Sequence, residues 1–514
     1  MFYYLPLYIL DSFSLSNLLG CGTIVLIGYF FYKFNIYPLY LSPLCKIPGP
    51  PVKNFFYGNV RVFEDSELGE RLVDWEKQYG SLFRVHGFLN RTFIVTTDPK
   101  VVQNIMTTHA YDYRKSRQLP QLTDTIGEGL LLAEGNVHHR QRKMMNPAFS
   151  FANTKEIIPI VVQISHQLKE IIMNQIGDKK EERITINSLI SKATLDIIGL
   201  VGFNYELNSL TTKSELAEAY DEITSTNKTY LDVLIILLSG YFPFVRKIPI
   251  NSNIRFMNAI KTVGKISENL VKERKNKIAK GELKGNDLLT LIIKLNEDLP
   301  KNEKMTDDEI KYQIMTFLAA GHHTTSQSLS WSLYFLSKHP EIQDRLREEL
   351  VQAFPDPNFQ PTFDEIEHLK YLDSVIKEIL RFIPPVSLLS RISTKDEVVN
   401  GYFIPKGSMF GISINTIHHK SSTWGEDANE FNPSRWLDPE IKSKVTNYTY
   451  LPFNTGQRSC IGIRLALLEF KIILAVLIRN FIFKEVEGHK ITTVYGVVTR
   501  PVPDIDLFVS KIDV

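Results

Sequence analysis

The clearest hydrophobic pattern along the chain is an apolar stretch close to its N-terminus. No charged residue lies between Asp11 and Lys33, and residues 18–32 are almost wholly apolar. Such a stretch is long enough to cross a bilayer as a helix. It lacks the basic start and the small-residue cleavage site of a signal peptide. We therefore predict an uncleaved membrane anchor over residues 1–34, with a buried N-terminal helix as the alternative.

Positive charge begins only after this stretch, at Lys33, Lys46 and Lys53. Basic residues that flank a membrane span tend to remain on its cytoplasmic side. The pattern therefore predicts a single-pass topology with the folded body in the cytoplasm.

Prolines are frequent in the next segment. They lie at Pro38, at Pro43 and in the run PGPP over residues 48–51. Proline fixes φ and has no N–H group to donate, so such a segment favours an extended conformation over a helix. We expect residues 35–53 to form a stiff, extended connector, a hinge that lifts the folded body, residues 54–514, off the membrane.

The body itself shows mixed periodicity, with helical patterns over most of residues 100–395. Asn400 and Gly401 are typical of a hairpin turn. Strand-like segments are expected at residues 82–85, 92–95, 402–404 and 494–498. This order predicts an α+β fold that is mainly helical.

One helix is expected to be unusually long. Thr306 and Glu309 form a capping-box pattern, and no proline follows until Pro340. About thirty residues at 1.5 Å each give roughly 50 Å, enough to cross the whole body. Its middle contains the small or hydroxylated residues Ala319, Ala320, Gly321, Thr324 and Thr325. Such residues weaken a helix and let another group approach its backbone, which indicates a site.

A second apolar run covers residues 233–238 and continues through Tyr241, Phe242 and Phe244. The run is too short to span a bilayer. It is expected to be a core helix, and the alternative is a segment that dips into the membrane surface near a substrate entrance.

Composition and charge narrow the function. The chain is 44% hydrophobic, and its 59 Lys and Arg residues against 57 Asp and Glu give a net charge of +2. This balance argues against a nucleic-acid-binding surface. The three cysteines are Cys21, Cys45 and Cys460, and two of them lie in or beside the apolar N-terminus. No disulfide framework is implied, and the body is expected to face a reducing compartment.

Cys460 lies in a segment, residues 453–462, that reads FNTGQRSCIG. A thiolate needs a positive or hydrogen-bonding field, and Gly456 and Gly462 let backbone amides approach the sulfur. Zinc is disfavoured because no second Cys or His lies at ligand spacing. The segment matches the haem-binding pattern F-x-x-G-x-R-x-C-x-G at every fixed position. On these residues the chain resembles the cytochrome P-450 family, in its eukaryotic microsomal type.

The resemblance implies the cytochrome P-450 fold, with a long central helix and small β-sheets behind an N-terminal transmembrane helix. It also implies haem b, iron protoporphyrin IX, with the iron ligated axially by Cys460. Thiolate ligation donates electron density to the iron and favours cleavage of the O–O bond of dioxygen. Around the cofactor the resemblance implies contacts from Phe453, Gly456, Arg458 and Gly462, with Arg458 reaching a propionate.

Glu378 and Arg381 form an E-x-x-R pair one helical turn apart, and Arg435 lies in the segment FNPSRW at residues 431–436. An isolated pair of this spacing would be interpreted as a solvated surface pair of little energetic value. In the family the three residues form a Glu-Arg-Arg network. The resemblance therefore implies a structural role in shaping the haem pocket.

The middle of the long helix reads AGHHTT over residues 320–325 and resembles the family's oxygen-binding motif A-G-x-D/E-T-T. The resemblance implies that Thr324 hydrogen-bonds dioxygen and guides protons to it. The chain departs from the pattern at His323, where most members carry a carboxylate. Imidazole can still relay protons near neutral pH, and the alternative is that His322 and His323 are satisfied by neighbouring groups. The residues implied in catalysis are Ala320, Gly321, His323 and Thr324.

Further basic residues resemble those that hold the haem propionates. His138 and Arg142 match W/H-x-x-x-R, and their i,i+4 spacing places both on one helix face, which suits the binding of an anion. Arg391 resembles another propionate-binding position. Arg140 and Lys143 would point away from the haem, as a solvated face or as a docking patch for an acidic electron donor.

The resemblance implies a monooxygenase that inserts one oxygen atom from dioxygen into a lipophilic small molecule, such as a sterol, a fatty acid or a xenobiotic. The chain has no Gly-rich flavin or nicotinamide fingerprint. NADPH–cytochrome P-450 reductase is therefore the expected electron donor, with cytochrome b5 as a second candidate. Together with the anchor, the resemblance implies the endoplasmic reticulum membrane.

Two other functions stay open. One is a haem-thiolate isomerase or dehydratase that acts on hydroperoxides without a reductase. Such enzymes usually lack the helix threonine and distort the cysteine loop, whereas Thr324 and the loop around Cys460 are intact here. The other is a non-catalytic haem-binding membrane protein, which reductase-dependent turnover of a lipophilic substrate would exclude.

Overall fold

A computed structural model describes residues 15–59, 68–117, 120–224, 229–282 and 287–512. Helices dominate these residues. They are α1 (Leu15–Phe31), α2 (Leu68–Tyr79), α3 (Pro99–Gln103), α4 (Pro120–Ile126), α5 (Gly135–Met145), α6 (Phe151–Lys155), α7 (Ile158–Ile176), α8 (Ile186–Phe203), α9 (Glu215–Thr224), α10 (Tyr230–Ser239), α11 (Asn251–Ala279), α12 (Leu288–Glu297), α13 (Asp307–Lys338), α14 (Pro340–Ala353), α15 (Phe363–Glu367), α16 (Lys370–Phe382), α17 (Ile414–His418), α18 (Ser421–Trp424), α19 (Pro439–Lys444) and α20 (Ile463–Asn480).

The strands form small sheets. They are β1 (Leu82–His86), β2 (Thr92–Thr96), β3 (Tyr113–Lys115), β4 (Glu182–Thr185), β5 (Leu388–Ser393), β6 (Glu397–Val399), β7 (Tyr402–Ile404), β8 (Met409–Ser413), β9 (Phe481–Glu485), β10 (Thr492–Tyr495), β11 (Thr499–Val502) and β12 (Asp506–Lys511). The largest sheet has the order β1-β2-β8-β5-β3, and the others are β4-β12-β9, β6-β7 and β10-β11. The predicted α+β class, mainly helical with small sheets, is confirmed.

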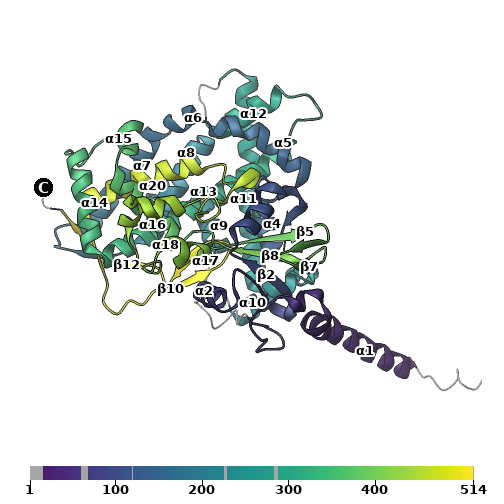
Figure 1. Cartoon of the computed structure of the whole chain (residues 1–514). Coiled ribbons are helices and arrows are strands. Elements are labelled where there is room, and N and C mark those ends of the chain that lie inside the picture. The colour runs from purple at the N-terminus through teal and green to yellow at the C-terminus, as the bar shows by residue number, and fades with distance from the viewer. Residues whose placement is uncertain (1–14, 60–67, 118–119, 225–228, 283–286, 513–514) are drawn as a thin grey trace, which may run out of the picture.

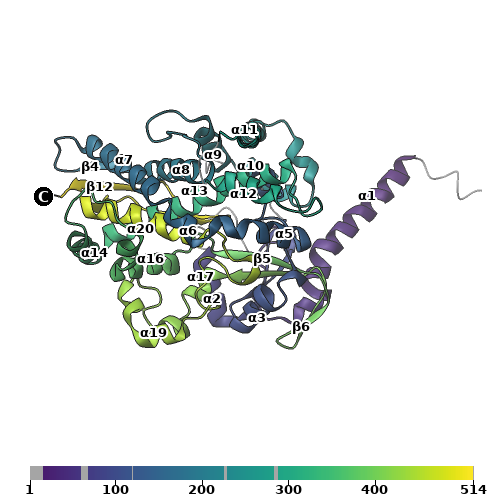
Figure 2. The same cartoon turned by 90° about the horizontal axis from the view of Figure 1, so that it is seen from above.

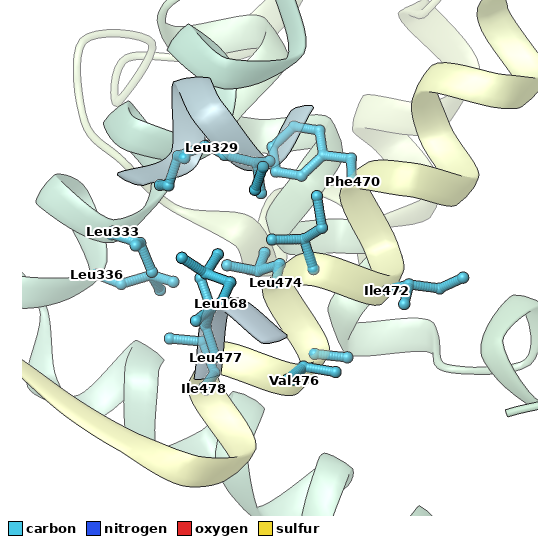
Figure 3. Close-up of a cluster of buried hydrophobic side chains, with 14 of the residues drawn as sticks. Leu168, Leu329, Leu333, Leu336, Phe470, Ile472, Leu474, Val476, Leu477 and Ile478 are labelled. Carbon is cyan, nitrogen blue, oxygen red and sulfur yellow. The ribbon is translucent and has the colours of Figure 1, made fainter. Parts of the chain in front are cut away.

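The long helix α13 runs through the helical part of the body. It spans 32 residues, and its capping box at Thr306 and Glu309 is formed as predicted. Leucines on its C-terminal half pack against α20 and α7, where Leu329 and Leu333 lie close to Phe470 and Leu168 (Figure 3). These side chains are at most 3% exposed. The main core therefore fixes α13 against the helix that follows Cys460.

Three of the four predicted strands are confirmed. β1 and β2 cover the first two, and Asn400 and Gly401 form the turn between β6 and β7, both with positive φ. The expectation for residues 494–498 is wrong in part, because β10 ends at Tyr495. Residues 496–498 form a bend that reverses the chain, so that β10 and β11 pair antiparallel.

Helix α1 projects from the body next to the largest sheet, on the side opposite the C-terminus (Figure 1 and Figure 2). Residues Leu19–Leu41 form a helix long and apolar enough to cross a membrane, and very little of it is buried. The alternative of a buried N-terminal helix is therefore wrong. The first fourteen residues of the predicted anchor lie outside the described residues.

The connector after α1 is not extended throughout, which corrects the expectation. Pro38 lies inside a π-helical segment, Tyr32–Leu41, and Pro43 begins a 3-10 turn, Pro43–Lys46. A proline is tolerated at the first position of a helical turn because its missing N–H would have no partner there. Only the run around residues 48–51 has the extended character that was predicted.

The connector is also held by the body, so it does not form a free hinge there. Asn90, fully buried after β1, donates from its side-chain amide to the Phe34 carbonyl at 3.1 Å, to Asn35 Oδ1 at 2.8 Å and to the Phe55 carbonyl at 3.0 Å. Ile47 is 1% exposed. The segment from residue 34 to residue 55 is thus fixed by one buried amide and by apolar packing.

Helix α10, which covers the second apolar run, is not the core helix that was expected. Its buried residues are Ile235 and Ser239, whereas Tyr230 is 80% exposed and Leu231 is 53% exposed. Phe244, in the turn that follows, is 68% exposed. Large apolar side chains on this surface favour the alternative, a segment that meets a membrane.

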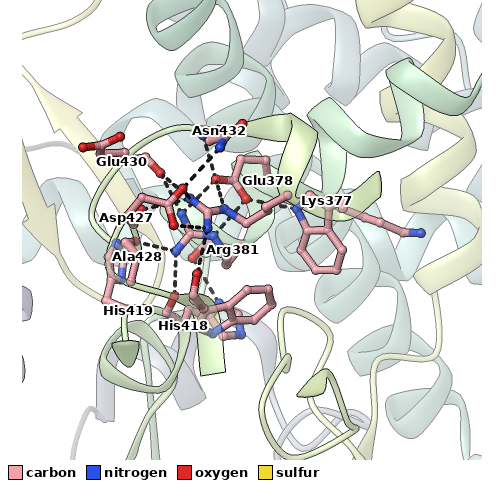
Figure 4. A network of polar contacts seen from close by, with 12 residues as sticks. Lys377, Glu378, Arg381, His418, His419, Asp427, Ala428, Glu430 and Asn432 are labelled. Atoms are coloured by element: carbon pink, nitrogen blue, oxygen red, sulfur yellow. Dashed lines mark hydrogen bonds and ion pairs between the residues drawn. The ribbon is translucent and has the colours of Figure 1, made fainter. Parts of the chain in front are cut away.

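A buried ion cluster braces the helical part of the body (Figure 4). Glu378 on α16 accepts hydrogen bonds from Arg381 at 2.8 Å and from Arg435 Nε at 2.9 Å. Glu378 and Arg381 are 0% exposed, so the interpretation of the pair as a solvated surface pair is wrong. Arg381 also donates to the carbonyls of His418 and Ala428, each at 2.7 Å. The cluster therefore joins α16 to the segment that leads toward Cys460.

We expect Glu378→Ala to yield little haem-loaded protein. Removing the shared carboxylate leaves Arg381 buried without its anion, and such losses cost about 3–5 kcal/mol. Haem content per protein and the urea midpoint measure the effect. Glu440→Ala is the matched control, because Glu440 pairs with Lys444 on the surface at i,i+4 and should change stability by less than about 1 kcal/mol. Normal haem content in Glu378→Ala would contradict the structural role.

Candidate active site

Cys460 lies in a tight loop between the 3-10 turn Gly456–Arg458 and α20. Its N–H donates to the carbonyl of Phe453 at 2.8 Å. Gly456 has a φ of +73°, and a Cβ at this position would lie 2.3 Å from the carbonyl oxygen of Met106. Only glycine fits such a position. The path of the loop to the cysteine therefore depends on Gly456.

The Cys460 side chain is accessible from an internal cavity although it lies deep in the protein. Burial raises the pKa of the thiol, whereas a hydrogen bond from the backbone of Gly462 and the charge of Arg142 act to lower it. Gly462 is also the residue that caps the N-terminus of α20, where the helix dipole is positive. Backbone and dipole act to favour a thiolate, but in the polypeptide alone they only partly offset burial, which keeps the pKa of the thiol above its usual value.

The cavity has a volume of about 1270 Å³. Ligand pockets commonly occupy about 300–1,000 Å³, so there is room for a cofactor and a substrate together. Cys460 lies in one wall, and Ala319, Ala320, His323 and Thr324 of α13 line the cavity as well. The structure thus brings the cysteine loop and the predicted oxygen-binding motif to one cavity.

A cluster of basic residues lines the same cavity. Four of its members were singled out from the sequence, His138, Arg142, Arg391 and Arg458, and the fifth is Lys115. Burial, with Arg458 nearby, lowers the pKa of Arg391 to about 10. Burial lowers the pKa of His138 to about 3, and the charge of Lys115 adds to the effect. His138 is therefore neutral near pH 7, whereas the buried arginines stay charged, and buried positive charges that lower one another's pKa favour the binding of an anion.

The hydrogen-bond and ion-pair partners of these basic residues do not neutralise all of their positive charge. Arg458 pairs with Glu134 and donates to the Tyr113 carbonyl at 2.6 Å, yet its Nε is buried without a hydrogen-bond partner among the described residues. Arg142 donates to the Ser459 carbonyl at 2.5 Å. Glu134 balances one of the positive charges. The donor set therefore suits a group with carboxylates, as the propionates of haem are.

Lys115 is the residue of this cluster that sequence reasoning missed. It lies on the short strand β3, next to the exposed Arg114, and no motif marks it. Its ammonium group donates to the carbonyls of Leu130 at 3.1 Å and Ala133 at 3.0 Å. Burial lowers its pKa to about 7. The alternation of side chains along a strand could have separated an inward lysine from an outward arginine, but only once the strand itself was known.

On α13 the Thr324 hydroxyl donates to the Ala320 carbonyl at 2.7 Å, so it can accept a hydrogen bond from the cavity. The absence of a side chain at Gly321 serves helix packing, since a Cβ there would lie 3.2 Å from Ile198 of α8. His322 is buried, and its Nε2 lies 2.7 Å from the Ser191 hydroxyl. His323 lines the cavity, and burial lowers its pKa to about 4.

Arg140 is not part of a free basic face. It forms an ion pair with Glu309, at the start of α13, and donates to the Lys304 carbonyl at 2.6 Å. Its contacts therefore join α5 to α13. Of Arg140 and Lys143, only Lys143, which is exposed, stays a candidate for a solvated face or a docking patch.

The comparison with known proteins agrees with this geometry. The model of the family described as Cytochrome P450 matches residues 48–507. The chain belongs to the cytochrome P450 family. Similar curated proteins include Cytochrome P450 monooxygenase 128 of Postia placenta, 34% identical over 90% of each chain. Cytochrome P450 monooxygenase FUM15 of Gibberella moniliformis is 30% identical over 90% of this chain and 86% of its own length. Ganoderic acid synthetase CYP5150L8 of Ganoderma lucidum is 30% identical over 89% of this chain and 91% of its own length.

As a P450, the protein is a haem-dependent monooxygenase of the oxidoreductase class. P450 enzymes hold the haem iron through a cysteine thiolate. The cavity fits this group on two observations of the structure, an accessible cysteine in a positive field and an under-compensated cluster of buried cations. P450 enzymes also work with redox partners and lipophilic substrates.

We expect Lys115→Gln to weaken haem retention. A hydrogen bond to a charged group contributes about 1.5–3 kcal/mol, so loss of the lysine should speed haem dissociation by roughly tenfold or more. Transfer of haem to apomyoglobin measures the rate. Arg114→Gln removes the neighbouring exposed charge from the same strand and should leave the rate unchanged. Equal rates in the two variants would exclude Lys115 from the haem site.

Proposed function

We propose that the protein oxygenates a lipophilic small molecule, a sterol, a fatty acid or a xenobiotic, at a haem ligated by Cys460. The observation that carries the proposal is one cavity of about 1270 Å³, which Cys460 shares with Ala320, His322, His323 and Thr324 of α13. Much of its remaining wall is apolar. Such a wall favours a lipophilic substrate through the hydrophobic effect.

The contacts described above support an assignment of the residues that hold the cofactor. Cys460 supplies the thiolate, Gly456 and Gly462 shape its loop, and Phe453 accepts the Cys460 N–H. A haem held by these residues would supply the chemistry of dioxygen activation. The groups that bind its propionates are His138, Arg142, Arg391 and Arg458, with Lys115 beside them.

The residues of α13 position hydrogen-bonding groups in the cavity and supply protons there. The Thr324 hydroxyl donates to the Ala320 carbonyl, which leaves its oxygen able to accept a hydrogen bond from a ligand in the cavity, and Gly321 keeps α13 close to α8. His323 occupies the position where the family usually has a carboxylate. A neutral imidazole both donates and accepts a hydrogen bond, so it performs the relay without a charge.

The location and the electron donor are the second part of the proposal. The chain is anchored by one helix in the endoplasmic reticulum membrane, with its body in the cytoplasm and NADPH–cytochrome P-450 reductase or cytochrome b5 as its donor. The base of the anchor packs on the segment after α10, with ring centroids 6.3 Å apart for Phe30 and Phe242 and 5.8 Å apart for Phe34 and Tyr241. Tyr241 also lines the cavity. A lipophilic substrate therefore has a short path from the bilayer.

The test is reductase-dependent turnover of the purified, haem-loaded protein, screened against a lipid and sterol extract for oxygenated products. Oxygen and NADPH should be consumed together with product formation. Conversion of hydroperoxides without reductase would favour an isomerase or dehydratase. Haem binding with no turnover under either condition would favour a non-catalytic protein.

We expect Cys460→Ser to abolish the thiolate-specific absorption band of the reduced carbon monoxide complex, because serine does not supply the sulfur ligand. Cys45→Ser is the control, since Cys45 lies in the connector and should leave the band intact. The measurement is the difference spectrum of each variant. Persistence of the band in Cys460→Ser would overturn the ligand assignment.

Thr324→Ala should divert reducing equivalents from product into hydrogen peroxide. The lost hydroxyl no longer positions a proton, and positioned proton transfer is worth roughly 10²–10⁴-fold, so product per NADPH should fall by at least about tenfold. Thr324→Ser keeps a hydroxyl and should retain most of the coupling. Unchanged coupling in Thr324→Ala would mean that another residue positions the proton.

A further inference from the structure

Arg500 is a cation that lines the cavity close to α13. It lies on β11, which packs against α13, and its near neighbours Val498 and Pro501 line the cavity as well. Burial lowers the pKa of His323 to about 4, and the charge of Arg500 adds to the effect. Because His323 precedes Thr324, the guanidinium lies near the part of the cavity where the oxygenation is proposed.

Most of the hydrogen-bonding capacity of Arg500 is unused. A guanidinium has five N–H donors. Among the described residues, its one hydrogen-bond acceptor is the carbonyl of Thr224, which binds Nη1. Arg500 forms no ion pair with any carboxylate of the part of the chain that the structure describes. Its remaining donors are therefore available to a ligand in the cavity.

The charged groups around Arg500 do not supply a full counter-charge. Asp221 and Asp504 line the same part of the cavity, but both are exposed to solvent, which screens their charge. Lys192 acts on Asp221, whose pKa burial raises and the lysine lowers. Burial lowers the pKa of Arg500, and the charge of Asp504 only partly offsets this. His323 stands where the family usually has a carboxylate, and its neutral ring adds no negative charge.

We propose that Arg500 binds a carboxylate of the substrate, so that the substrate is a lipophilic carboxylic acid. The proposal rests on the proposed function and narrows its substrate class. A carboxylate matches the planar fork of a guanidinium and can accept two parallel hydrogen bonds from it. The hydrocarbon part of the molecule then lies against apolar side chains of the cavity, among them Leu195, Leu388 and Leu389.

The same guanidinium acts against neutral substrates. A neutral lipophilic molecule in this part of the cavity would remove water from Arg500 without replacing its hydrogen bonds, which is unfavourable. A carboxylate supplies both the acceptors and the counter-charge. Selectivity therefore arises from attraction of the acid and from the desolvation cost that a neutral molecule meets. Hydrogen bonds to charged groups are strong enough to change a Kd by about tenfold or more.

The first experiment measures ligand binding to the haem-loaded protein from the shift of the haem absorption. The probes are dodecanoic acid and its methyl ester, dehydroabietic acid and its methyl ester as a rigid pair, and dodecyltrimethylammonium, a cation that cannot ligate iron. In at least one pair the acid should bind about tenfold or more tightly than its ester. The proposal is wrong if neither acid is preferred to its ester. Tighter binding of the ammonium ion than of dodecanoic acid would assign the site to Asp221 and Asp504 instead.

The second experiment repeats the titrations with variants. Arg500→Gln should raise the Kd of the preferred acid by roughly tenfold or more and change that of its ester by less than about twofold. Arg500→Lys keeps the charge without the fork and should retain part of the preference. Arg91→Gln is the matched control, because Arg91 also lines the cavity, beside the ring of Tyr241. A preference that survives in Arg500→Gln and disappears in Arg91→Gln would overturn the assignment.

Asp504→Asn tests the charge of the site without a change at Arg500, and it decides the matter if Arg500→Gln yields little haem-loaded protein. Asp504 is exposed, and its carboxylate repels an anion bound nearby. Its neutralisation should strengthen binding of the preferred acid by roughly threefold, as expected for an exposed charge, and leave the ester unaffected. Unchanged or weaker binding of the acid would contradict an anionic ligand at Arg500.

The outcomes separate the two proposals. If the preference for an acid depends on Arg500 but the protein shows no reductase-dependent turnover, the proposed function fails and the carboxylate site stands. If the protein oxygenates neutral lipids and prefers neither acid to its ester, the substrate class is wrong while the proposed function stands.

Discussion

The carboxylate of Glu378 is fully buried between two guanidinium groups, and the path of the chain toward Cys460 depends on it. A lone buried carboxylate would be strongly unfavourable, and each guanidinium would be as well. Together they also satisfy carbonyls from residues 418–430 and the indole N–H of Trp436. This cluster holds a segment with little regular structure against α16, so that the cysteine loop begins from a fixed position.

Buried charge is also decisive at the cavity, but there the charges of the side chains do not cancel. There the protein collects Lys115, Arg142, Arg391 and Arg458 with fewer carboxylates than cations, so the electrostatic balance is incomplete in the polypeptide alone. In the Glu378 cluster a second carboxylate, Asp427, pairs with Arg435 at 2.9 Å, so two carboxylates balance two guanidinium groups. Such a balanced cluster stabilises the fold, whereas an unbalanced one favours the binding of an anion. The contrast explains why Arg381 and Arg435 are structural and why the cavity arginines suit a cofactor with two carboxylates.

The sequence was sufficient where a physical rule acts locally. The capping box fixed the start of α13, the turn residues fixed the β6-β7 hairpin, and the spacing around Cys460 marked the ligand loop. The sequence was insufficient where contacts with residues far away along the chain determine the local conformation or the role of a residue. Pro38 argued for an extended connector, but Asn90, 52 residues later, binds that segment and favours a helical path. Likewise Lys115 has no motif, because its role arises only when β3 packs beside Arg391.

His323 shows how one departure from a family pattern changes its surroundings. A carboxylate at this position would carry a charge into a buried pocket, and the nearby Arg500 would attract it. A neutral imidazole removes that charge and instead needs two neutral hydrogen-bond partners. The ring contacts of Tyr220 and His322 with His323 supply packing, and among the described residues Nε2 of His323 has no hydrogen-bond partner. The exchange of acid for imidazole therefore replaces the need for a counter-ion at this position with a need for neutral hydrogen-bond partners.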